Sequence, residues 1–289
     1  MGMIKNTFKT TILLAGLGGL MILIGQALGG GTGAAIGLFL GVAMSFGSYW
    51  FSDRLALAAS KAKPVDAQSA PELYRMVQDL TQRSNLPMPR LFIIPSAQPN
   101  AFATGRNPEH SAVAVTEGIL QTMDKQELMG VLAHELAHVK HRDILISSVA
   151  SAIGMAVMFA ARMAMFGAMF GGVGGRDDRD GGGGVIGALA MIILAPIAAM
   201  LIQMAISRSR EFEADRGGAE MMGSGEPLAR ALEKLEAASK RAPMNVHPAM
   251  AQAFIVNPLT GRNRPAFASL FSTHPATQER IARLRDWRP

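Results

Sequence analysis

The chain has 289 residues, of which 49% are hydrophobic and only 17% are charged. A mean hydropathy of +0.22 is too high for an ordinary soluble enzyme, so part of the chain is expected to lie in lipid. The chain contains no cysteine, which excludes disulfides and thiolate metal ligands, so a bound metal must be held by histidine and carboxylate groups. The net charge of +6 does not indicate nucleic-acid binding, because the basic residues are scattered and many flank apolar runs.

Four apolar stretches each approach the roughly 20 residues that a bilayer-spanning helix needs. They are residues 11–29, 33–51, 144–161 and 185–206. The first stretch could instead be a signal peptide, since residues 26–29 loosely resemble a small-residue cleavage site. Its apolar core is long for a signal peptide, however, and a second apolar stretch follows at once. The sequence therefore favours an uncleaved anchor and predicts four transmembrane helices in two hairpins.

Basic residues flank the first hairpin on both sides. Lys5 and Lys9 precede it, Arg54, Lys61 and Lys63 follow it, and the turn between its helices carries no charge. Because cytoplasmic loops carry the excess of lysine and arginine, both ends of this hairpin are expected to face the cytoplasm. The glycine-rich loop of the second hairpin has balanced charge and can cross to the other side.

The segment after the first hairpin predicts a small α+β unit. Ser69 and Glu72 match a capping box, which predicts a helix that begins there and continues through residue 83. Residues 90–94 and 111–116 have the pattern of short strands, and residues 99–104 are a candidate third strand at an edge. The expected fold class is therefore α+β and mainly helical, with a small sheet and four transmembrane helices.

The next helix carries the chain's strongest chemical signal, the H-E-x-x-H pattern of His134, Glu135 and His138. Two imidazoles four residues apart lie on one helix face, close enough to bind one zinc ion, and the intervening carboxylate can take a proton from a metal-activated water. The alternative is a chance pair of surface histidines. An Asp124/Glu127 capping box favours the zinc site, because it places the pattern on a well-formed helix.

A catalytic zinc needs a third protein ligand and an open position. The best candidate lies after the second hairpin, where Glu211 and Asp215 share a helix face and Glu213 points away from them. Glu211 would bind the metal and Asp215 would accept a hydrogen bond from a ligand histidine. The alternative is that these are solvated carboxylates paired to Arg208 and Arg210. Further helices are expected at residues 211–222, at 227–239 and from about residue 275.

Three blocks of sequence together resemble the HtpX family of membrane-bound zinc metalloproteases. They are HELAHVKHRD (134–143), SREFEAD (209–215) and STHP (272–275), and the resemblance spans nearly the whole chain. The CAAX prenyl proteases and the BepA-like proteases share the same H-E-x-x-H with a downstream E-x-x-x-D. The resemblance implies a gluzincin-type fold, one Zn²⁺ per chain bound by His134, His138 and Glu211, and a bacterial inner-membrane enzyme that removes misfolded membrane proteins under stress.

The same resemblance implies an edge strand that receives the substrate. It falls on Asn100, Ala101, Phe102, Ala103, Thr104 and Gly105. The division of the chain then becomes a cytoplasmic N-terminus (1–10), a first hairpin (11–51), the first part of the protease domain (52–143), a second hairpin (144–206) and the second part of that domain (207–289).

His274 precedes a proline at an expected helix N-terminus, where the helix dipole favours the neutral imidazole. It could donate a hydrogen bond to the developing oxyanion, or it could gate the zinc as the resemblance also allows. Simple helix capping is a third possibility, and His247 is a weaker candidate for the same roles. The two active roles predict opposite effects of His274→Ala on activity.

These observations predict an endopeptidase that cleaves membrane proteins on the cytoplasmic side. Both zinc ligand segments lie a few residues from an expected transmembrane helix, which at 1.5 Å per residue is within roughly 10 Å of the membrane surface. The expected partners are membrane-protein substrates and the lipid bilayer, with no nucleic acid. The alternatives are a specific processing protease of the prenyl-peptide type and a non-enzymatic scaffold or chaperone with structural zinc.

Overall fold

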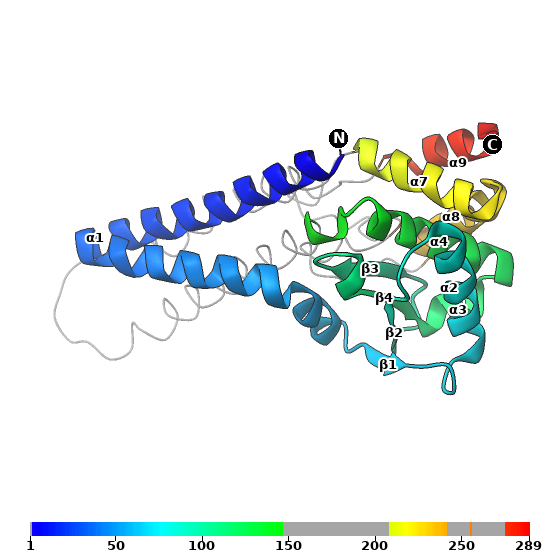
Figure 1. Cartoon of the computed structure of the whole chain (residues 1–289), viewed down its shortest axis with the longest axis horizontal. Coiled ribbons are helices and arrows are strands. Elements are labelled where there is room, and N and C mark those ends of the chain that lie inside the picture. Colours follow the sequence, from blue (N-terminus) through cyan, green and yellow to red (C-terminus); the bar gives the residue numbers. More distant parts are fainter. Residues whose placement is uncertain (1, 147–207, 242–254, 256–274) are drawn as a thin grey trace.

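The structure is a computed structural model that describes residues 2–146, 208–241, 255 and 275–289 (Figure 1). Its first helix, α1 (Gly2–Ala59), folds back on itself at Gly30, whose φ of +58° lies in the left-handed region that glycine tolerates. The two arms run side by side in Figure 1, and the hydroxyl of Ser45 donates to the carbonyl of Leu14 across them at 3.2 Å. The first predicted hairpin is therefore present as the two arms of α1.

The membrane spans predicted from the sequence are only partly described. Residues 30–47 of α1 are long and apolar enough to cross a membrane by length and composition, and residues 14–23 of the other arm form a shorter apolar stretch. The second predicted hairpin, except for residues 144–146, lies outside the described residues. The described part of the chain thus holds one clear candidate span in place of the four expected.

A sheet of four strands follows α1. Its strands are β1 (Lys63–Val65), β2 (Arg90–Ile94), β3 (Ala101–Gly105) and β4 (Ser111–Thr116), arranged in the order β1-β2-β4-β3. β2 and β4 are parallel, and the two outer strands pair antiparallel to them. β3 is therefore an edge strand. β1 was not predicted, because three residues with a proline in the middle give too weak a strand pattern.

Helices surround this sheet. They are α2 (Pro71–Ser84), α3 (Glu117–Thr122), α4 (Lys125–Lys140), α7 (Arg208–Met222), α8 (Glu226–Arg241) and α9 (Thr277–Asp286), with a 3₁₀ turn at Pro108–His110. Each helix predicted for the protease domain is present, and α3 is an addition. The capping box predicted for α2 is wrong, because the hydroxyl of Ser69 bonds the carboxylate of Asp66 and Ala70 stands at the N-cap without a side-chain hydrogen bond.

The sheet separates two apolar layers. The larger layer lies between the sheet and helices α2, α4, α7, α8 and α9, and includes Leu80, Val113 and Leu132, each almost completely buried. The smaller layer lies on the other face, where Ala56 and Leu57 at the end of α1 pack against Phe102 of β3. The edge strand is therefore held between the helix α1 that enters the candidate span and the helix α4 that carries His134.

Candidate metal centre

Helix α4 begins at the predicted capping box. The carboxylate of Asp124 accepts the N–H of Glu127, and the carboxylate of Glu127 accepts the N–H of Asp124, both at 2.9 Å. Two orphan donors of the first helical turn are satisfied in this way, which fixes where the helix starts. His134 and His138 then lie one turn apart, with their Nε2 atoms separated by 3.2 Å.

Helix α7 brings Glu211 to the two histidines. Its carboxylate oxygens lie 3.9 Å from Nε2 of His134 and 3.7 Å from Nε2 of His138. The approach depends on Gly218, because a Cβ there would lie only 3.0 Å from the backbone nitrogen of His134. A glycine at this position of α7 lets the two helices touch backbone to backbone.

The ligand atoms of His134, His138 and Glu211 all lie within 4.8 Å of one another. Zinc binds such nitrogen and oxygen atoms at about 2.0–2.2 Å, so tetrahedral ligands lie roughly 3.3 Å apart. The closest separations are 3.2, 3.7 and 3.9 Å, and one oxygen of Glu211 has to move nearer to both histidines to complete such a site. Two imidazoles and a carboxylate in a chain without cysteine thus fit Zn²⁺, and three protein ligands leave a fourth position open, as a catalytic site requires.

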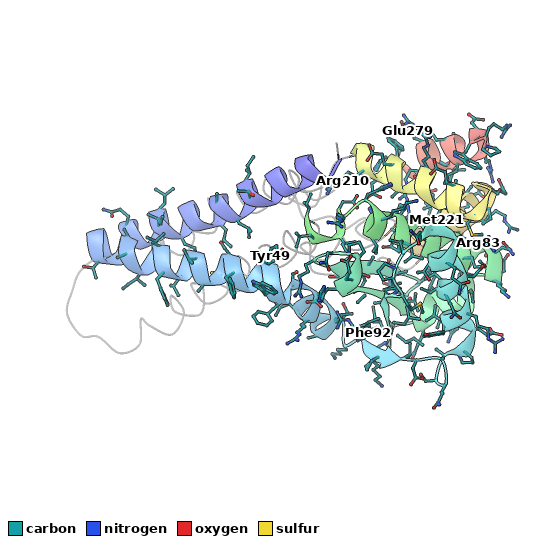
Figure 2. The ribbon with its side chains drawn as sticks, viewed as in Figure 1. Tyr49, Arg83, Phe92, Arg210, Met221 and Glu279 are labelled. Atoms are coloured by element: carbon teal, nitrogen blue, oxygen red, sulfur yellow. The ribbon has the colours of Figure 1, made fainter. Side chains whose placement is uncertain are left out.

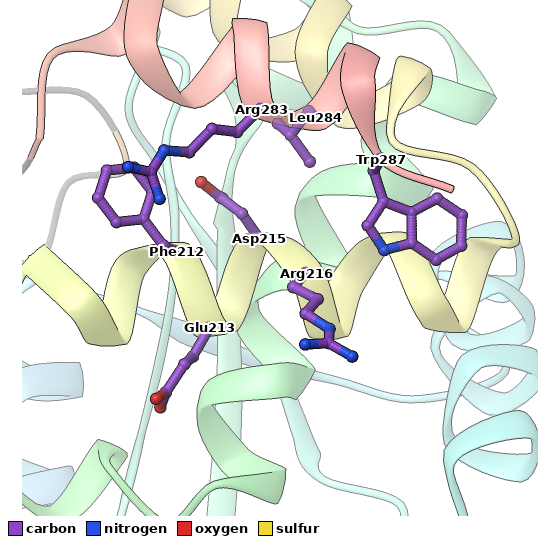
Figure 3. Close-up of a pocket in the computed structure, with 7 residues that line it drawn as sticks. All are labelled: Phe212, Glu213, Asp215, Arg216, Arg283, Leu284 and Trp287. Carbon is purple, nitrogen blue, oxygen red and sulfur yellow. The ribbon is translucent and has the colours of Figure 1, made fainter. Parts of the chain in front are cut away.

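Asp215 lies one turn after Glu211 and backs His134. Its Oδ1 is 3.0 Å from Nδ1 of His134, which directs Nε2 of that ring toward the metal position. Glu213 is exposed and points away from α9, whereas Asp215 points toward it (Figure 3). The predicted helix register of Glu211, Glu213 and Asp215 is therefore the one in the structure. Glu213 and Asp215 both border a cavity of about 370 Å³ that Phe212 and Trp287 also line.

Arg280 of α9 completes the arrangement around Asp215 and was not anticipated from the sequence. It is 1% exposed, and its Nε and one terminal nitrogen donate to the two oxygens of Asp215 at 2.9 and 2.7 Å. Burial alone would raise the pKa of Asp215, but this guanidinium holds it at about 2. Arg280 also donates to the carbonyl of Ile255, which ties α9 to a residue near the edge strand.

His138 has a carboxylate of its own, which was also missed. Nδ1 of His138 lies 3.2 Å from Oδ2 of Asp143, a residue only 3% exposed at the turn after α4. Burial lowers the pKa of His138, but the neighbouring Asp143 outweighs it and raises the pKa to about 9 in the absence of metal. Each ligand histidine is therefore backed by a buried carboxylate.

Comparison with known proteins identifies the family. A family model described as peptidase family M48 matches residues 67–288. The chain therefore belongs to peptidase family M48. It is 55% identical over 281 residues to a protease HtpX homolog of Syntrophobacter fumaroxidans, which covers 97% of this chain and 99% of that protein. It is 52% identical over 282 residues to the homolog of Syntrophotalea carbinolica, with 97% and 98% covered.

The crystal structure of S. mikatae Ste24p shows a more distant likeness, with 18% identity and a TM-score of 0.49 over 98% of this chain and 66% of that one. The resemblance to the HtpX proteases is confirmed by the closer relatives. The chain is an M48 zinc metalloprotease, and His134, His138 and Glu211 form its zinc site.

Glu135 of this M48 site lies against the edge strand. Its carboxylate is 6% exposed and accepts the backbone N–H of Ala103 at 2.7 Å. Burial raises the pKa of Glu135, while the two neighbouring histidines oppose that rise. The carboxylate is thus next to the zinc ligands and also bonded to the strand predicted to receive substrate.

The other predicted site residues are placed as follows. Asn100 lies just before β3 and bonds Thr116 of β4, and Ala101 to Gly105 form β3 itself. His274 and the alternative His247 lie outside the described residues. His110, which is not a predicted site residue, is exposed and contacts Asn107.

Proposed function

We propose that this zinc endopeptidase works in the bacterial inner membrane and cleaves misfolded or damaged membrane proteins on the cytoplasmic side. The support comes from the helix α1, whose candidate span at residues 30–47 leads directly into the protease domain. Many of its large apolar side chains are exposed, which suits lipid and not water. The basic residues around the first hairpin favour the cytoplasmic side.

One observation carries this proposal. Strand β3 contacts the catalytic centre on one side and the membrane helix on the other: Ala103 donates to Glu135, and Phe102 packs against the end of α1. Arg106, directly after β3, lies over the ring of Trp50 of α1 at 4.5 Å from the ring centroid. Tryptophan is typical of the membrane interface, so the strand that would receive substrate lies near the lipid surface.

The substrate is proposed to bind as an added strand. Because Ala103 points its N–H toward Glu135 and away from β4, the backbone groups of Ala101 and Ala103 lie on the outer side of β3. An extended peptide that pairs there takes the N–H of Ala103 from Glu135 and leaves that carboxylate free beside the scissile bond. This mode requires an unfolded or flexible segment, which damaged membrane proteins expose.

The chemistry follows from the groups around that peptide. Zinc supplies the Lewis acidity that activates water and polarises the scissile carbonyl. Glu135 is within reach to accept the proton of the attacking water and to give it to the leaving amine. Asp215, Arg280 and Asp143 hold the two ligand imidazoles.

The test uses the full chain, purified and reconstituted in liposomes. Its substrates are a membrane protein with a destabilised cytoplasmic loop, the same protein without the destabilising change, and casein. We expect zinc-dependent cleavage of the destabilised protein above the intact one. Cleavage at a single fixed peptide bond, whatever the stability of the substrate, would instead indicate the processing-protease alternative.

Topology is tested separately with alkaline phosphatase fusions. A fusion after Lys63 is expected to be inactive and a fusion after Asp180 to be active, because only the second lies on the expected external side. Activity at the first position would place the catalytic domain outside and contradict the proposal.

A further inference from the structure

The turn that ends the metal helix α4 has an unusual geometry. The N–H of Arg142 donates to the carbonyl of Val139 at 3.1 Å, and the N–H of Asp143 donates to the carbonyl of His138 at 3.2 Å. These two bonds make a Schellman motif, with Arg142 at the position that must adopt the left-handed conformation. Arg142 has a φ of +57°, although glycine is usual there.

The motif brings Asp143 next to His138. Asp143 bonds the carbonyl of His138 through its own N–H and places its carboxylate 3.2 Å from Nδ1 of the same residue. With Nδ1 occupied in this way, Nε2 of His138 faces Nε2 of His134 at 3.2 Å and Glu211 at 3.7 Å. The turn therefore fixes the orientation of the His138 ring.

Helix stability does not explain these two residues. A carboxylate at a helix C-terminus meets the negative end of the helix dipole, which is unfavourable. A non-glycine residue in the left-handed conformation is unfavourable as well. Both features make sense if the turn serves the metal ligand and not the helix.

We propose that Asp143 is the positioning residue of His138, presented to it by the left-handed turn at Arg142. Each of the two ligand histidines would then be oriented by its own carboxylate. Asp215 reaches His134 from another helix at 3.0 Å, whereas Asp143 reaches His138 from the end of the same helix. Because Asp143 directly precedes the apolar stretch that starts at Ile144, the orientation of His138 is set where the chain turns toward the expected membrane segment.

The first experiment measures zinc affinity by chelator competition in the detergent-purified full chain. Asp143→Ala is expected to weaken zinc binding about 10- to 100-fold, as the loss of such a carboxylate partner does in other zinc sites. Asp143→Asn should lose less, because its amide oxygen still accepts the Nδ1–H. Asp79→Ala, which removes an exposed carboxylate of α2, is the control. Zinc affinity of Asp143→Ala within twofold of wild type would overturn the proposal.

The second experiment displaces Asp143 without changing it. Arg142→Gly and Arg142→Val both remove the arginine, but only glycine adopts the left-handed conformation readily. We expect zinc to bind several-fold more weakly to Arg142→Val than to Arg142→Gly. The visible spectrum of the cobalt-substituted protein should change in the valine variant and in Asp143→Ala, because it reports ligand geometry.

A purely structural role for the turn gives a different result. Arg142→Val and Asp143→Ala would then lower the thermal unfolding midpoint of the metal-free protein while leaving the cobalt spectrum and zinc affinity of the folded fraction at wild-type values. That outcome would also overturn the proposal. If Asp143→Ala does not fold, the comparison of Arg142→Gly with Arg142→Val still tests the proposal.

Discussion

Helix α1 and the domain that follows it distribute polar and apolar side chains in opposite ways. Along α1, Leu23, Phe39 and Phe46 are each more than 60% exposed. In the domain, His134, Asp215 and Arg280 are each 3% exposed or less. Figure 2 shows α1 extending from the domain as two arms, whereas the domain side chains pack into a dense mass.

The difference reflects the surroundings that each region requires. Exposed apolar side chains are unfavourable in water and favourable in hydrocarbon, so the surface of α1 suits a lipid environment. Buried charges are unfavourable unless they are paired, and in the domain Asp215 is paired with Arg280 and Glu127 with Lys234. The domain retains this arrangement because a zinc site needs charged and polar groups shielded from bulk water.

Glu135→Gln tests the chemistry of the buried groups and has the largest expected effect. The amide cannot accept a proton, so proteolysis should fall by about 10²- to 10⁴-fold, while zinc stays bound because Glu135 is not a ligand. Measured on the same sample, activity should fall while metal content stays at the wild-type level. Glu213→Gln, at an exposed position of α7, is the control. Full activity of Glu135→Gln would remove the assigned mechanism.

Arg280→Met tests whether the buried charges depend on one another. It leaves Asp215 buried without its bidentate partner, and breaking such a pair typically costs about 3–5 kcal/mol. Arg283→Met on the same helix is the matched control, because that arginine is exposed and its contacts are with the exposed Glu279 and the ring of Phe212, not with a buried charge. Chemical unfolding in detergent should show a large loss for the first variant and a small one for the second. Equal losses would mean that Arg280 acts only through packing.

These two arginines also show what the sequence could not predict. Helical spacing places Arg280 on the face of α9 that carries Ile281 and Leu284, and Arg283 off that face. The sequence does not show, however, that α7 packs against α9 and brings Asp215 to Arg280. The role of Asp143 was not predicted either. Its contact with His138 depends on a left-handed turn at Arg142, and a non-glycine residue gives no sequence signal for that conformation. By contrast, His134 and His138 were predictable because helical spacing fixes which side chains share a face, and Glu211 was predicted from its spacing to Asp215 together with the resemblance to the HtpX family.

Local capping signals were predictable to differing degrees. The Asp124/Glu127 box is present as expected, whereas Ser69 bonds Asp66 in a tight turn and leaves α2 uncapped by a side chain. A serine before a helix can bond either way, and the sequence pattern does not decide between them. Strands β2 and β4 were predicted at their observed bounds because they are continuous β-branched or apolar runs.

Phe39→Asp tests the other side of the comparison. An aspartate in the middle of a spanning helix costs about 3 kcal/mol of apparent insertion free energy. We expect less of the protein to resist carbonate extraction from membranes, while Phe39→Leu should behave as wild type. Unchanged membrane retention in the aspartate variant would mean that this arm of α1 does not lie in lipid.

The pH dependence of the metal-free protein tests the pair of His138 and Asp143. The pKa of His138 is raised to about 9 from 6.5, so its protonated form stabilises the fold fully below pH 6.5 and loses that contribution as the pH rises through 9. The loss can reach about 3 kcal/mol at most. Thermal unfolding after chelation should therefore show lower stability at pH 9.5 than at pH 6.5. The difference should shrink in Asp143→Asn, and an equal difference in both proteins would contradict the assignment to this pair.

Arg106→Gln tests the contact between the two regions and has the smallest expected effect. The guanidinium lies over Trp50, and a cation–π contact of this kind contributes about 0.5–1 kcal/mol at exposed sites. Since Phe102 also packs against α1, the domain should stay folded and keep its zinc. We expect a small rise in KM for a membrane-embedded substrate and no change for casein, because only the first depends on how β3 is held relative to the lipid surface. Arg90→Gln is a suitable control, since Arg90 also contacts α1, through Asp53, but lies on β2 away from the edge strand. An equal rise in KM for both substrates would mean that Arg106 shapes β3 itself and does not link it to the membrane helix.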